Sequence, residues 1–230
     1  MPPFPTIFIA FIGGFLPALF WLWFWLREDN KHPEPTRLIA LSFLFGACAV
    51  PLAVPFEKLI DLGGFSPLIV LILWAFVEEA LKYLAAFAGG MHTQAEDEPI
   101  DAMIYLVTAA IGFAAAENVL FLLHPLANGE MFTTLVTGNI RFIGTTLLHV
   151  LSSATVGAFV AFSFYKRKKY RIEHMLYGII LATALHALFN FFIINSGQRW
   201  MFTIFAILWF AIVVLMLLFE RVKRISRSKN

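Results

Sequence analysis

Long apolar runs separated by short polar connectors recur along the whole chain. Each run approaches the roughly 20 apolar residues that an α-helix needs to cross a bilayer. Pro33 and Pro35 lie in the first polar connector, where they prevent one helix from continuing into the next. The pattern therefore predicts an all-α, polytopic membrane helix bundle. Its seven transmembrane helices are expected over residues 5–26, 38–54, 66–91, 102–123, 140–164, 174–194 and 200–219.

The composition agrees with a membrane protein. The chain of 230 residues is 60% hydrophobic and 14% charged, whereas soluble domains are about a quarter charged. We therefore expect one integral membrane domain over residues 1–230, with the lipid bilayer as a partner and no nucleic acid. The single cysteine, Cys48, excludes an intramolecular disulfide and any metal site built from several cysteines.

Basic residues gather in alternate connectors, and this asymmetry predicts the orientation. Lys and Arg are frequent in residues 27–37, 166–171 and 221–230, whereas the opposite set of connections holds only Lys58, Arg141 and Arg199. Cytoplasmic loops carry an excess of Lys and Arg. The N-terminus is therefore expected outside and the C-terminus in the cytoplasm.

Within the second helix, Pro51 and Pro55 predict a kink or an early end near Pro51.

Three charged residues interrupt the apolar run at 66–91. Glu78, Glu79 and Lys82 stand at membrane depth, where each charge costs roughly 2.5–3.5 kcal/mol on insertion scales. On a helix, Lys82 neighbours both carboxylates, at spacings of four and three residues. One interpretation is a buried ion pair that holds the helix packing together. The other is a functional site, and it depends on the next three helices.

The following helices carry further polar residues in their interiors: Glu117, Asn118, His149, His186 and Asn190. At about 1.5 Å rise per residue, Glu78, His149 and His186 come within a few ångström of mid-membrane, with Glu117 nearer the outer leaflet. A single histidine on an apolar helix is more often a packing residue. Two imidazoles with carboxylates at one depth instead indicate a site.

Two kinds of hydrolytic chemistry fit such a set. A buried glutamate can take a proton from water, while imidazoles and an amide stabilise the oxyanion of a tetrahedral intermediate. Alternatively, the same groups can bind a divalent metal such as zinc. The candidate ligands are Glu78, Glu117, His149 and His186.

Other familiar hydrolase signatures are missing from the sequence. It contains neither HExxH nor GxSxG. Ser152 and Ser153 follow His149 closely, but bonding back to the helix is the expected fate of their hydroxyls. The four aspartates, Asp29, Asp61, Asp97 and Asp101, fall in loops or at helix ends, so an intramembrane aspartyl dyad is not expected.

The motifs resemble those of the PrsW family of intramembrane proteases, which is related to the CAAX prenyl endopeptidases and to bacteriocin-immunity-type membrane proteases. The resemblance consists of EExxK at residues 78–82, GFAxxEN at 112–118, a histidine at His149 and HAxxN at 186–190. Four motifs in order on four successive helices make a specific signal. They place the catalytic core at about residues 66–195.

The resemblance implies an endopeptidase, either glutamate-type or metal-dependent, that cleaves a membrane-anchored protein. A single-pass anti-sigma-factor-like regulator is the kind of substrate that some members cleave. Carried over by position, Glu78 is the general base with Glu79 in support, and Glu117 is a second essential carboxylate. By the same resemblance, His149, His186 and Asn190 would position water or stabilise the oxyanion. Lys82 orients the glutamates, and Asn118 supports the site.

Two other functions stay open at this point. A buried Glu and His chain also suits a proton-coupled membrane transporter. A non-catalytic membrane immunity or binding protein could keep the polar cluster for packing alone. For the protease, a multi-pass location in a bacterial plasma membrane is expected.

Overall fold

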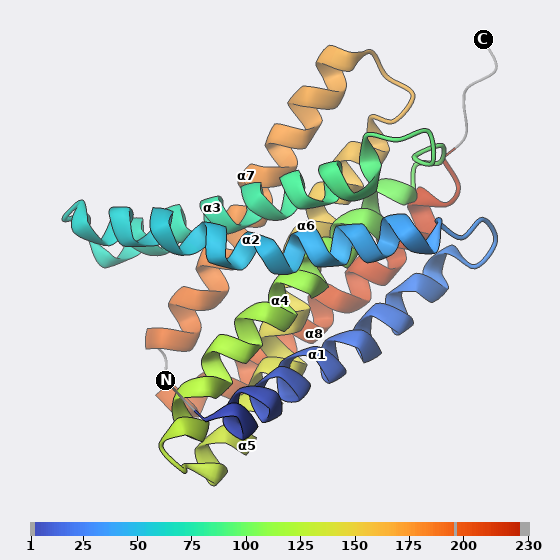
Figure 1. Cartoon of the computed structure of the whole chain (residues 1–230). Coiled ribbons are helices and arrows are strands. Elements are labelled where there is room, and N and C mark those ends of the chain that lie inside the picture. Colours follow the sequence, from blue (N-terminus) through green and yellow to red (C-terminus); the bar gives the residue numbers. More distant parts are fainter. Residues whose placement is uncertain (1–2, 196, 226–230) are drawn as a thin grey trace.

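The computed structural model describes residues 3–195 and 197–225, and no strand occurs within these residues (Figure 1). The prediction of an all-α fold is confirmed. Two π-helical turns, Phe87–Met91 and Arg141–Thr145, extend α3 and join α5 to α6. The α-helices are α1 Phe4–Leu26, α2 Thr36–Leu62, α3 Pro67–Ala86, α4 Asp101–Ala127, α5 Met131–Ile140, α6 Thr146–Phe162, α7 Lys168–Asn195 and α8 Gly197–Val222.

Because α5 and α6 run on as one segment, the described chain forms seven long helical segments. Six of them are long and apolar enough to cross a membrane. The exception is α3, whose 20 residues include the three charged residues Glu78, Glu79 and Lys82. A polytopic membrane bundle is therefore the fold, while the orientation of the termini stays a prediction.

The largest departures from the predicted helix boundaries occur in the second and fifth helices. The second helix was expected to end at 54, with a kink or an end near Pro51, but α2 continues through Pro51 and Pro55 to Leu62. Prolines are tolerated in membrane helices because neighbouring groups and local adjustments satisfy the freed carbonyls. The fifth segment begins at Met131 rather than at 140, because the π-helical turn at Arg141–Thr145 keeps the chain helical across the expected start.

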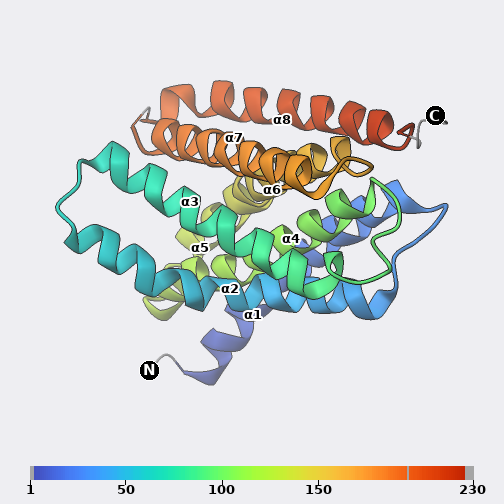
Figure 2. The ribbon, with the colours of Figure 1, turned by 90° about the horizontal axis from the view of Figure 1, so that it is seen from above.

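The helices do not stand parallel. In Figure 1, α2 and α3 form an antiparallel hairpin that crosses the direction of α1, α4, α6 and α8, and Figure 2 shows α7 and α8 side by side along one edge. The α4 helix lies in the centre and packs against α1, α2 and α6. Every residue from Asp101 to Ala115 is buried. A helix that is surrounded on all sides in this way serves as the core of the bundle.

Glycines allow α2 and α4 to touch through their backbones. A Cβ on Gly46 would lie 2.0 Å from the carbonyl oxygen of Ala109, and a Cβ on Gly112 would lie 2.0 Å from that of Phe43. Small residues at such contacts let membrane helices approach closely. The GFA segment at 112–114 is therefore a packing element as well as part of a sequence motif.

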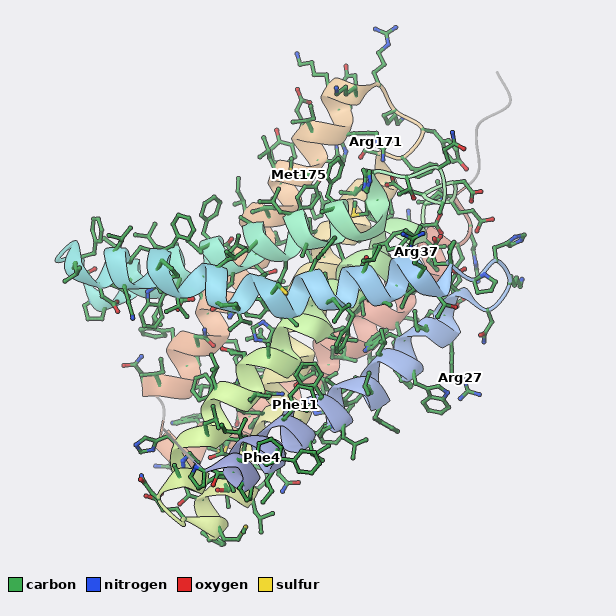
Figure 3. The ribbon with its side chains drawn as sticks, viewed as in Figure 1. Phe4, Phe11, Arg27, Arg37, Arg171 and Met175 are labelled. Carbon is green, nitrogen blue, oxygen red and sulfur yellow. The ribbon has the colours of Figure 1, made fainter. Side chains whose placement is uncertain are left out.

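The polar connectors meet at one end of the bundle. Arg171 pairs with Glu96 at 3.0 Å, and Lys223 pairs with Glu28 at 2.7 Å, which ties the end of α8 to the first connector. Figure 3 shows Arg27, Arg37 and Arg171 at the side opposite Phe4. This arrangement agrees with the alternation of basic connectors along the sequence.

The contact between α2 and α4 predicts the effect of one methyl group. Gly112→Ala should destabilise the protein by about 1–3 kcal/mol, because the added Cβ meets backbone that cannot move aside easily. Thermal unfolding of the purified protein in detergent would measure it. The control is Gly138→Ala, whose Cβ would meet only the Leu122 side chain at 3.7 Å and should leave stability unchanged or slightly higher. Equal melting temperatures for the two variants would contradict the contact.

Candidate active site

Four helices bring the predicted polar residues together. Glu78, Glu79 and Lys82 come from α3 and are all buried, and His149 on α6 and His186 on α7 are also buried. From α4 come Glu117 and Asn118, whose neighbours include Arg141 at the end of α5. The helical repeat turns Glu78, Glu79 and Lys82 toward the bundle. Because α3 packs against α4, α6 and α7, these side chains meet the polar residues of the other helices.

Glu79 is fully engaged by its neighbours. Its Oε1 accepts a hydrogen bond from Lys82 Nζ at 2.6 Å and lies 2.8 Å from His186 Nδ1. Its Oε2 accepts a hydrogen bond from Ser153 Oγ at 3.1 Å. The side chain is 0% exposed. Glu79 is therefore a fixed anion that holds the imidazole of His186 in place.

His149 lies between a cation and a carboxylate. Lys82 Nζ is 2.9 Å from its Nδ1, and Glu117 Oε2 is 3.0 Å from its Nε2. An ammonium can only donate, so Nδ1 accepts and Nε2 carries the proton that is donated to Glu117. The contact also corrects the sequence estimate of depth, which put Glu117 nearer the outer leaflet than His149. Tilted helices bring the two residues to one level.

Arg141 is a member of this network that the sequence analysis did not single out. Its Nη2 donates to Glu117 Oε2 at 2.5 Å, and its Nε donates to Asn118 Oδ1 at 2.6 Å. Asn118 in turn donates to Thr146 Oγ1 at 3.3 Å. The only sequence signal was an arginine in a connection that is otherwise poor in basic residues.

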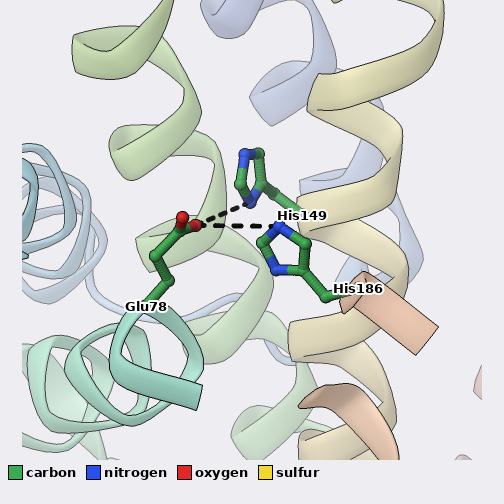
Figure 4. Close-up of side chains that lie close together, drawn as sticks. All are labelled: Glu78, His149 and His186. Carbon is green, nitrogen blue, oxygen red and sulfur yellow. Dashed lines mark ion pairs between the residues drawn. The ribbon is translucent and has the colours of Figure 1, made fainter. Parts of the chain in front are cut away.

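One oxygen of Glu78 lacks a hydrogen bond. Its Oε2 is buried and makes no hydrogen bond to any residue that the structure describes, and its ion-pair partner Lys82 Nζ is 3.9 Å away. It lies 3.8 Å from His186 Nε2 and 3.9 Å from His149 Nδ1 (Figure 4). One ligand atom from each of these three residues lies within 4.8 Å of the others. Ligand atoms of a tetrahedral zinc site stand about 3.3 Å apart, so small shifts would let the three share one ion.

Both imidazoles are oriented in the same way. Each has one nitrogen at hydrogen-bond distance from a carboxylate, Glu79 for His186 and Glu117 for His149, and presents the other nitrogen to Glu78. Metal-ligating histidines usually bond a carboxylate through their second nitrogen in this manner. An ion at His149 Nδ1 would replace the contact with Lys82, which keeps its stronger partner Glu79.

The structure leaves one predicted site residue outside the network. Asn190 lies one turn after His186 and is half-buried, with no side-chain hydrogen bond to a described residue. Its role stays a prediction. The two serines behave differently. Ser152 Oγ donates to the Leu148 carbonyl of its own helix at 2.8 Å, as expected, whereas Ser153 Oγ donates to Glu79.

Comparison with known proteins identifies the family. Residues 34–218 match the family described as PrsW family intramembrane metalloprotease. The chain belongs to this family. It is similar to Protease PrsW of Clostridioides difficile, with 27% identity over 83% of this chain and 81% of that protein. It is also similar to Protease PrsW of Bacillus subtilis, with 21% identity over 85% and 87% of the two chains. No solved structure matches.

Membership of the PrsW family confirms the predicted activity. The chain is an intramembrane protease, and the transporter and the non-catalytic protein are not favoured. With six helices that could span a bilayer and bacterial relatives, it is a multi-pass bacterial membrane protein.

The buried pair of Lys82 and Glu79 predicts a large effect on stability. Lys82→Met should cost about 3–5 kcal/mol, because it leaves the charge of Glu79 uncompensated inside the bundle. Denaturant or thermal unfolding in detergent would measure the loss. Lys169→Met is the control: this lysine pairs with Glu173 at 3.9 Å and its side chain is 84% exposed, so the change should stay within about 0.5 kcal/mol. Similar stabilities for the two variants would contradict the prediction.

Proposed function

We propose that this protease is metal-dependent and that Glu78, His149 and His186 hold one zinc-class divalent cation. The observation that carries the proposal is the buried Oε2 of Glu78, which has no hydrogen bond to a described residue and is faced by one nitrogen of each imidazole. A buried carboxylate oxygen without a hydrogen bond is costly, and Lys82 Nζ, at 3.9 Å, is too far away to donate one. A directly bound cation would remove the cost.

The donor set fits the proposed ion. Two imidazole nitrogens and one carboxylate are a ligand set of catalytic zinc sites, which keep a further position open for water or substrate. When bound, such an ion supplies Lewis-acid polarisation of the scissile carbonyl and makes water more acidic. In this assignment Glu78 is a ligand, whereas the resemblance alone made it the general base.

Glu117 is the proton acceptor in this proposal. Its side chain is 19% exposed, against 10% for Glu78 and 0% for Glu79, so it is the carboxylate of the cluster that water reaches most easily. Arg141 and His149 both bond its Oε2, while its Oε1 has no hydrogen bond to a described residue. Glu117 Oε1 can therefore take a proton from the attacking water and pass it to the leaving amine.

The remaining polar residues position these groups. Glu79 selects the tautomer and orientation of His186, and Lys82 balances the charge of Glu79. Arg141 and Asn118 hold Glu117 in place. Asn190 is half-buried one turn beyond His186, so its amide is free to donate a hydrogen bond to the substrate carbonyl.

The substrate class follows from where the groups lie. Glu117, His149 and His186 stand on helices that could span a membrane, where a soluble protein cannot reach and a membrane-anchored segment can. We therefore assign a membrane-anchored protein as substrate. A single-pass, anti-sigma-factor-like regulator, which the sequence resemblance suggested, is the specific candidate.

Removing a ligand tests the metal site. Glu78→Gln and His186→Asn should each lose bound zinc and cleave a single-pass model substrate far more slowly, by more than the roughly 10–100-fold typical of outer-shell changes. Metal analysis of the purified proteins and cleavage in proteoliposomes would measure both. His92→Asn, an exposed histidine outside the cluster, is the control and should keep metal and activity. Undiminished zinc and cleavage in both ligand variants would refute the site.

Changing Glu117 separates proton transfer from metal binding. Glu117→Gln, assayed at saturating zinc, should bind the ion and still lower kcat by roughly 10²–10⁴-fold, the usual contribution of a general base. Metal stoichiometry and single-turnover cleavage give the two readouts. A kcat equal to that of the unaltered protein would remove Glu117 from the role.

A further inference from the structure

A second group of carboxylates lies at the other end of α4. Asp29 follows α1, Glu34 lies in the connector before α2, and Asp101 is the first residue of α4. One oxygen from each lies within 4.8 Å of the others. Asp101 and Glu117 stand sixteen residues apart on one helix, about 24 Å at 1.5 Å per residue, so this group is separate from the active site.

Most of the group is buried, and no lysine or arginine that the structure describes pairs with it. Asp29 is 6% exposed and Asp101 is 1% exposed, and Glu34 is half-buried. The Oδ2 of Asp29 is buried with no hydrogen-bond partner in the described part of the chain. Across residues 3–195 and 197–225, no lysine or arginine forms an ion pair with any of the three. Three carboxylates in this state repel one another and lack solvation.

The surrounding residues hold the carboxylates in place. Tyr105, fully buried one turn into α4, donates its hydroxyl to Glu34 Oε2. Asp101 Oδ2 accepts the backbone N–H groups of Asp97 at 2.9 Å and Glu98 at 2.6 Å. These bonds occupy one oxygen of Glu34 and one of Asp101. Asp29 Oδ2 is left for a ligand.

We propose that Asp29, Glu34 and Asp101 bind one hard divalent cation of the Mg²⁺ or Ca²⁺ class. The donors are all oxygens, which Mg²⁺ and Ca²⁺ prefer, whereas zinc favours nitrogen and sulfur. The cation joins the connector after α1 to the start of α4. It thereby clamps the end of the helix that carries Glu117, and it acts as a structural or regulatory ion rather than as part of the chemistry.

The test uses the full-length protein in detergent with the Glu78→Gln change, so that zinc at the active site does not contribute. After chelation and removal of the chelator, Mg²⁺, Ca²⁺ and Mn²⁺ are added separately and thermal unfolding is followed. We expect a saturable rise in melting temperature, roughly 5–10 °C at a hundredfold excess over Kd. Which of Mg²⁺ and Ca²⁺ acts at lower concentration identifies the ion.

Two further substitutions in that background assign the effect. Asp29→Asn should abolish the rise and leave the cation-free protein as stable as before or more stable, because it removes one of three repelling charges. Tyr105→Phe keeps all the ligands and should weaken Mn²⁺ binding about 10–100-fold, as measured by paramagnetic resonance. Asp97→Asn, at an exposed carboxylate beside the site, is the control and should respond like the parent.

The alternative is that the three carboxyls share protons and bind no ion. In that case none of the cations changes the melting temperature, and the proposal is overturned. An equal rise in the parent and in Asp29→Asn would overturn it as well, because the cation would then act elsewhere. Neither result bears on zinc binding or cleavage by the chain with Glu78 intact.

Discussion

The proposed active site depends on the salt bridge between Lys82 and Glu79. At 2.6 Å and without exposure to solvent, it lets a carboxylate remain charged inside the bundle. That charge then orients His186, while the same ammonium contacts His149. Because a buried charge needs a partner, the pair determines which nitrogen of each imidazole faces Glu78. These are Nε2 of His186 and Nδ1 of His149, which also accepts from Lys82, and they lie 3.8 and 3.9 Å from Glu78 Oε2.

The α4 helix connects the two carboxylate groups of the molecule. It is surrounded by α1, α2 and α6, and its glycine contact with α2 fixes their separation. Glu117 near its far end bonds His149, and Asp101 at its first turn lies beside Asp29 and Glu34. A rigid, buried helix of this kind transmits the position of one end to the other. An ion bound at the start of α4 would therefore affect the position of Glu117.

The two groups differ in the chemistry that they offer. The active site combines nitrogen and oxygen donors, and a basic residue stands beside each of its carboxylates: Lys82 beside Glu78 and Glu79, and Arg141 beside Glu117. The group at the end of the bundle has oxygen donors, and a tyrosine hydroxyl and backbone amides hold it. The first set suits a Lewis acid that polarises a carbonyl, and the second suits a hard ion that ties loops together. The two proposed cations would therefore have different roles.

The sequence by itself determined the class of fold and the approximate positions of the helical segments, and it singled out the motif residues of the proposed site. Hydrophobic runs, prolines and charges in apolar helices are local signals, and each can be read within about 20 residues. Only the tertiary structure decided the pairing of Arg141 with Glu117 and of Ser153 with Glu79, and the proximity of Asp29 to Asp101. The tertiary structure also allows α2 to continue past Pro51, because neighbouring helices can satisfy the carbonyl that a proline frees. The physical reason is that contacts between residues far apart in the chain depend on how tilted helices cross, and no local pattern records that angle.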